Sequence, residues 1–154
     1  MNRIRIAKDK ADLVKALTEL EEKTGPFKTY ADLIVFAASL AIKKKKRIPV
    51  TEISTREPYP INIEVFCSRG YGSIIKLIAL VDTKDTKILS QTNEEIEENR
   101  IKIFEEYANG GLEILQNELR GAVNYSERLL LVLISERYQK SQPEEEFDLT
   151  KFLR

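Results

Sequence analysis

YADLIVFAASLAI, residues 30–42, is apolar nearly all the way round when it is drawn as an α-helix. Such a helix has no side to present to water, so it is buried among other elements. Its four alanines permit a second helix to pack closely against it. Thr29 stands directly before the stretch and belongs to the residue types that cap helix N-termini. The stretch therefore predicts a central buried helix.

The segment before this helix predicts a strand and a first helix. Residues 1–8 alternate as in a short half-buried strand, with Ile4 and Ile6 on one face and Arg3 and Arg5 on the other. Asp9 is placed to cap a helix over residues 11–24, whose apolar side chains recur at three- and four-residue spacing. Gly25-Pro26 is placed to end it.

The segment after the central helix predicts a short strand and more helices. Residues 47–60 contain three prolines, which favour an extended connection. We next expect a short strand that contains Ile61, Ile63 and Val65, a helix over residues 74–81 and a turn over residues 85–89. Three further helices are expected: one that starts at residue 93, one over residues 112–119 and one over residues 126–138. Gly110 and Gly111 in a helix interior would cost roughly 2 kcal/mol relative to alanine, so we expect a break there.

These elements predict a mainly α protein, a compact domain of about five helices with two short strands. Residues 1–154 form one domain, made of a basic strand-helix-helix segment (1–47), a helical remainder (60–139) and an acidic, aromatic tail (140–154). The strand, helix, helix order of the elements in the first segment is compatible with a ribbon-helix-helix module, in which strands pair across a homodimer. That arrangement would make the chain a homodimer.

The composition excludes most enzyme classes. Among 154 residues there are 25 basic and 25 acidic side chains, no histidine and one cysteine, Cys67. This removes His-based acid–base catalysis, His-ligated metals and intrachain disulfides. No apolar run reaches about 18 residues and the start lacks a signal-peptide core, so we expect a cytoplasmic protein without membrane contact. The prediction is a protein that is not an enzyme and has no cofactor and no metal.

Two features resemble functional sites but have a simpler interpretation. Glu94 and Glu98 share one helix face at a spacing that magnesium accepts, although a solvated acidic face is far more common. Cys67 follows an apolar strand and is expected to be a small buried hydrophobe.

The N-terminal half carries the candidate DNA contacts. Residues 1–50 hold 12 basic and 6 acidic side chains, whereas residues 91–154 hold 8 and 14. In a ribbon-helix-helix arrangement Arg3 and Arg5 would enter the major groove, and Lys28 and Thr29 would place the next helix N-terminus on a phosphate. The alternative is a solvated strand face and an ordinary cap.

A basic run follows the central helix, made of Lys43, Lys44, Lys45, Lys46 and Arg47. Cations at a helix C-terminus are favoured by the helix dipole whatever the function. Five in a row exceed what this needs, so phosphate contact and a solvated terminus are equally good interpretations.

Three stretches carry a resemblance to a known family: GPFKTYADLIVFAASLAIKKKKR (25–47), INIEVF (61–66) and IFEEYANGGLEIL (103–115). Together they resemble DNA phosphorothioation-associated protein 4, also called dnd system-associated protein 4. The most specific piece is FEEYANGGL, residues 104–112. The resemblance implies a bacterial or archaeal system that replaces a nonbridging phosphate oxygen of DNA with sulfur, or restricts DNA without that mark in antiviral defence. Members are accessory proteins with no established catalytic residues.

We therefore expect a non-catalytic accessory protein that contacts DNA or an enzyme of the system. In the adaptor version, a helix broken at Tyr107, Asn109, Gly110 and Gly111 admits a partner's backbone. The alternative for these residues is a tight interhelical turn in the core. The alternative for the whole chain is a ribbon-helix-helix transcriptional regulator of such an operon.

Overall fold

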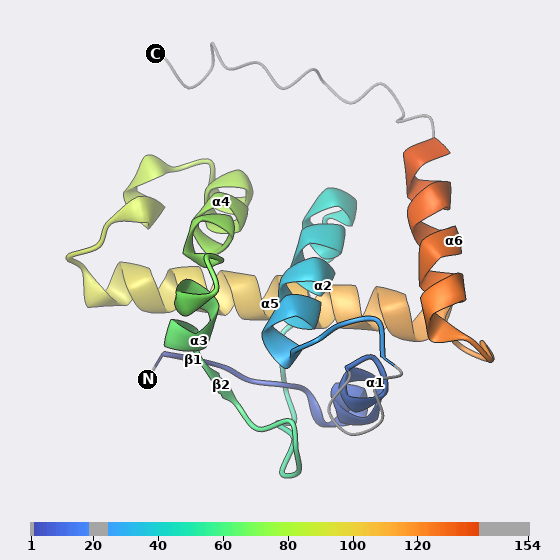
Figure 1. Ribbon diagram of the computed structural model, residues 1–154. Coiled ribbons are helices and arrows are strands. Elements are labelled where there is room, and N and C mark those ends of the chain that lie inside the picture. The colour runs from blue at the N-terminus through green and yellow to red at the C-terminus, as the bar shows by residue number, and fades with distance from the viewer. Residues whose placement is uncertain (1, 19–24, 139–154) are drawn as a thin grey trace.

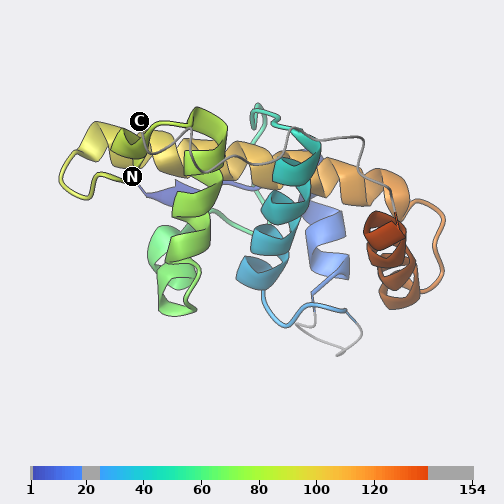
Figure 2. The same cartoon turned by 90° about the horizontal axis from the view of Figure 1, so that it is seen from above.

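The computed structural model describes residues 2–18 and 25–138. One long helix, α5 (Glu94–Glu118), forms the axis of the molecule. Three helices cross it at successive points along its length, in the order α4 (Gly72–Thr83), α2 (Tyr30–Lys44) and α6 (Tyr125–Tyr138), and both views agree on this order (Figures 1 and 2). The architecture is mainly α, as predicted, with six α-helices in the described residues where about five were expected.

The central helix predicted from the sequence is α2. Thr29 caps it, because its side-chain oxygen accepts a hydrogen bond from the Asp32 amide. Eight of its fifteen residues are buried, and it makes its most extensive contacts with α5. The prediction of a buried central helix is confirmed.

The two strands form one small antiparallel sheet. β1 (Arg3–Ile4) pairs with β2 (Ile61–Asn62), with Arg3 opposite Asn62 and Ile4 opposite Ile61. The predicted alternation is confirmed, since Ile4 and Ile6 are buried and Arg3 and Arg5 are exposed.

The second strand is shorter than predicted, because Asn62 starts a helix. Its side chain accepts a hydrogen bond from the Glu64 amide, and α3 (Ile63–Ser68) follows at once. Residues 63 and 65 are therefore helical, and the prediction of a strand through them was wrong. Cys67 lies on the solvent side of this helix, so the prediction that it is buried was wrong too.

The first helix also differs from its prediction. Lys8–Lys10 form a 3-10 turn, η1, and α1 (Ala11–Ala16) follows without a side-chain cap, so Asp9 does not cap a helix. The helix ends eight residues before the predicted boundary, and residues 19–24 of that stretch lie outside the described residues. Residues 86–89 form a second 3-10 turn, η2 (Thr86–Leu89). The tail, 140–154, also lies outside.

The predicted break at Gly110 and Gly111 is absent, because α5 runs through them without interruption. A Cβ on Gly110 would lie 2.0 Å from the Lys46 carbonyl oxygen, and one on Gly111 only 1.8 Å from that of Ala37. The glycines let the backbones of α2 and the following segment touch α5 directly. This tight packing offsets the weak helix propensity of the pair.

Within the described part of the chain, no helix combines the length and the apolar character that crossing a bilayer requires.

Candidate nucleic-acid interface

The basic run at the end of α2 is largely neutralised by acidic side chains of the same chain. Lys43 and Lys44 reach Glu136 of α6 at 3.2 and 2.6 Å. Lys46 reaches Glu113 of α5 at 3.0 Å. These cations therefore link the end of α2 to α6 and α5.

Arg47 is the centre of a network that joins α2 to α4 and α5. It contacts Asp82 at 3.0 Å and Glu106, and Tyr107 donates its hydroxyl hydrogen to Asp82. Burial, together with this hydrogen bond, raises the pKa of Tyr107 to about 12. Of the run, only Lys45 makes no ion pair with a described residue.

The N-terminus of α2 already holds an anion, the carboxylate of Asp32. Arg69 binds it with two nitrogens at 3.0–3.1 Å, and Tyr71 donates a hydrogen bond to it. Burial raises the pKa of Asp32, but the bonds from Tyr71, Thr29 and Arg69 outweigh this effect and hold it below its usual value. A phosphate placed at Lys28 and Thr29 would meet this carboxylate.

Arg5 is likewise engaged inside the molecule. Its guanidinium contacts Glu105 of α5 through Nε and Nη2, at 2.6–3.1 Å, and its backbone N–H adds a bond of 2.8 Å. The hydrogen bond to Glu105 raises the pKa of Arg5. Glu105 is 3% exposed, so this pair anchors β1 to α5.

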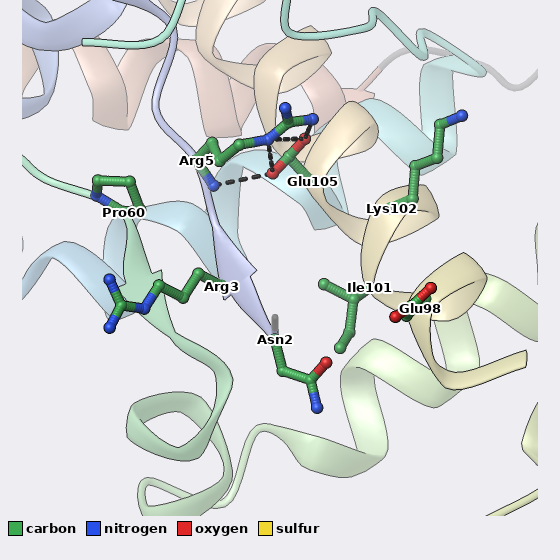
Figure 3. A pocket seen from close by; sticks show the side chains of 8 residues that line it. All are labelled: Asn2, Arg3, Arg5, Pro60, Glu98, Ile101, Lys102 and Glu105. Carbon is green, nitrogen blue, oxygen red and sulfur yellow. Dashed lines mark hydrogen bonds and ion pairs between the residues drawn. The ribbon is translucent and has the colours of Figure 1, made fainter. Parts of the chain in front are cut away.

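A hollow of about 460 Å³ lies between β1 and α5 and is shown in Figure 3. Arg3 projects from one side and Lys102 from the other, and neither makes an ion pair with a described residue. The remaining lining residues are Asn2, Arg5, Pro60, Glu98, Ile101 and Glu105. The hollow therefore offers two available cations beside a carboxylate, Glu98.

A second hollow adjoins the first and is acidic. It shares Asn2, Arg3 and Glu98 with the first, and Asn62, Ile63, Glu64, Glu94 and Glu97 complete its lining. Asn2 donates a hydrogen bond to Glu97 at 3.2 Å. We call the surface made of Arg3, Lys102, Glu64, Glu94, Glu97 and Glu98 the mixed-charge face, since it carries charges of both signs.

The residues proposed for partner binding lie inside the fold. Tyr107 and Asn109 are each 5% exposed, and Gly110 and Gly111 are buried too. The Asn109 amide nitrogen donates to the carbonyls of Ile48 and of the next residue, at 3.2 and 3.3 Å. In this conformation the four residues contact the chain's own segments.

Sequence reasoning missed the α5 side of the hollow. Glu98, Ile101, Lys102 and Glu105 follow one another at i, i+3, i+4 and i+7, which places them on a single helix face. That spacing could have identified the face, but nothing local indicates that β1 lies against it.

Comparison with known proteins gives one match. A family model described as DNA sulphur modification system-associated protein 4 matches residues 3–152. No curated protein and no solved structure matches the chain.

Proposed function

We propose, from the premise that this chain belongs to the DNA sulphur modification system-associated protein 4 family, that it is a non-catalytic accessory protein contacting a protein of that system. The proposed contact is made by the mixed-charge face. Its non-catalytic character rests on the sequence, which has no histidine for acid–base chemistry.

The observation that carries this proposal is the distribution of available charge. Five of the eight cations considered for DNA contact, Arg5, Lys43, Lys44, Lys46 and Arg47, are paired with carboxylates of the same chain. The two cations at the hollow, Arg3 and Lys102, stand beside Glu98 and the other carboxylates of the mixed-charge face. Double-stranded DNA presents a uniform row of negative charge, about one per 1.7 Å of helix axis. Such a row would be repelled by the carboxylates here. A protein surface can match both signs at once.

The regulator alternative receives less support from the same residues. β1 is already paired with β2 of its own chain, and Arg5 is bound to Glu105. In a ribbon-helix-helix dimer that strand would pair with its copy, and its outward arginines would be available to bases.

The test measures binding to each protein of the modification system by calorimetry. The double variant Arg3→Glu, Lys102→Glu should weaken the interaction at least about tenfold, equivalent to 1.4 kcal/mol. Lys28→Glu reverses another exposed cation and should leave the affinity unchanged. Equal binding by the wild type and the double variant would contradict the proposal.

DNA binding is measured on the same samples. We expect weak binding to a duplex, with little salt dependence, since each neutralised phosphate adds about −0.9 to the slope of log affinity against log salt. A steep slope that the double variant flattens would instead support the nucleic-acid interpretation and overturn ours.

A further inference from the structure

Helix α6 is apolar on two opposite sides, and the fold covers only one of them. Leu129 and Val132 are 6% and 8% exposed and face the rest of the molecule. At about 100° per residue, the opposite side carries Leu130, Leu131, Ile134 and Tyr138. Their exposed fractions are 57%, 53%, 43% and 74%. We call these four residues the outer stripe.

Contacts at both ends of α6 fix its orientation. Near its start, Arg128 donates a hydrogen bond of 3.0 Å to the Glu118 carbonyl of α5. Near its end, Glu136 binds Lys43 and Lys44 of α2, and the hydrogen bond from Lys44 lowers the pKa of Glu136. Glu136 lies on the same side of the helix as Leu129, so these contacts hold the outer stripe toward solvent.

The charges at the ends of the outer stripe are of opposite sign. Glu127 lies beside its beginning, and Arg137 lies beside its end, with its guanidinium 5.9 Å from the centre of the Tyr138 ring. When two such helices run antiparallel, each Glu127 meets the Arg137 of the other copy. When they run parallel, like charges meet at both ends, which is unfavourable.

We propose that the outer stripe is a self-association surface, on which a second copy of this chain docks its own α6 in antiparallel orientation. A twofold axis at the middle of the stripe lets the same four apolar residues cover one another, as an isologous interface requires. The charge pattern makes the stripe complementary to itself. This contact is separate from the mixed-charge face, because α6 and β1 lie toward opposite ends of α5 (Figure 1).

Sedimentation equilibrium on the full chain tests the association. We expect a dimer of the 17.7 kDa chain, and a monomer for the double variant Leu130→Glu, Ile134→Glu, with association weakened at least about tenfold. Leu77→Glu on α4 is the matched control, because Leu77 is also 57% exposed. This control should remain dimeric. Circular dichroism checks that every variant keeps its helix content.

A charge exchange tests the orientation. Glu127→Arg and Arg137→Glu should each weaken the dimer, and the two together should restore it, because the exchanged pairs are again of opposite sign. A wild-type chain that stays monomeric over the whole concentration range overturns the proposal. Single charge variants that dimerise as well as the wild type overturn the antiparallel arrangement.

Discussion

Helices α2 and α6 have nearly the same length, cross the same long helix and are both apolar on more than one side. In α2 eight residues are buried, whereas in α6 only Leu129 and Val132 are. The difference comes from their neighbours: α2 is flanked by α1 and α4 and lies against α5, but α6 stands at the end of the row. Apolar character therefore indicates a surface to be covered, and the chain itself covers it only for α2.

The two helices also differ in how they are attached. α2 meets α5 backbone to backbone, with Ala37 against Gly111 and Lys46 against Gly110. α6 is joined to α2 by charged side chains at its end. The first kind of contact tolerates almost no added volume, while the second is sensitive to pH and salt.

The largest expected effect is that of Gly111→Ala. The new Cβ would lie 1.8 Å from the Ala37 oxygen, so α2 and α5 must move apart, and we expect a loss of at least about 3 kcal/mol in the free energy of unfolding. Urea denaturation measures it. Gly72→Ala is the control, since its Cβ would have only an ordinary contact of 3.6 Å with the Cys67 sulfur. A small loss for Gly111→Ala would refute the close contact.

Leucine truncation compares the two helices directly. Leu33 of α2 is fully buried, and Leu33→Ala should cost about 3 kcal/mol through lost burial and the cavity left behind. Leu131 of α6 is 53% exposed, and Leu131→Ala should stay within about 0.5 kcal/mol in dilute protein. Thermal melts at low concentration measure both. Similar losses would show that α6 is covered as fully as α2.

Tyr107→Phe tests the network at the end of α2. The variant lacks the hydroxyl that donates a hydrogen bond to Asp82, and we expect its free energy of unfolding to be lower by about 1 kcal/mol. Because the folded pKa of Tyr107 is raised from 10.0 to about 12, its stabilisation is complete below pH 10 and disappears as the pH rises through 12. The difference in unfolding free energy between wild type and variant should shrink over that window. A difference independent of pH would contradict the assignment.

The smallest effect is expected for Glu136→Gln, which weakens the link between α6 and α2. Because these ion pairs are partly open to solvent, we expect the variant to lose about 0.5 kcal/mol of unfolding free energy, and added salt should make this loss smaller. The folded pKa of Glu136 lies below its ordinary 4.5, so the contribution is complete above pH 4.5 and is lost as the pH falls through the folded value. Urea denaturation across this range measures it, and Glu52→Gln, at a solvent-exposed carboxylate outside both proposed contact surfaces, serves as a control.

Local patterns predicted much of the fold. Thr29 is the predicted cap of α2, and α5 starts at the predicted place, directly after Asn93, because helix starts depend on residues within one turn. The unbroken α5 was not predicted, because the contact that offsets the cost of Gly111 comes from Ala37, far away in sequence. The Asn62 cap that shortens β2 is local, and the sequence pattern could have revealed it.

The candidate site was less predictable for the same reason. The residues of the basic run could be recognised, but their partners Glu136, Glu113 and Asp82 belong to other helices. Whether a surface cation is available depends on these distant neighbours. Arg3 and Arg5 stand two residues apart with the same predicted role, yet of the two only Arg5 forms an ion pair with a described carboxylate.

The contact between Ala37 and Gly111 also sets an order of events during synthesis. At roughly 5 to 20 residues per second, the ribosome needs roughly 4 to 15 seconds to extend the chain from one of these residues to the other. Through this interval α2 has emerged without the helix that covers it. The nascent chain therefore displays this apolar helix uncovered for seconds, an interval in which a chaperone has time to bind it.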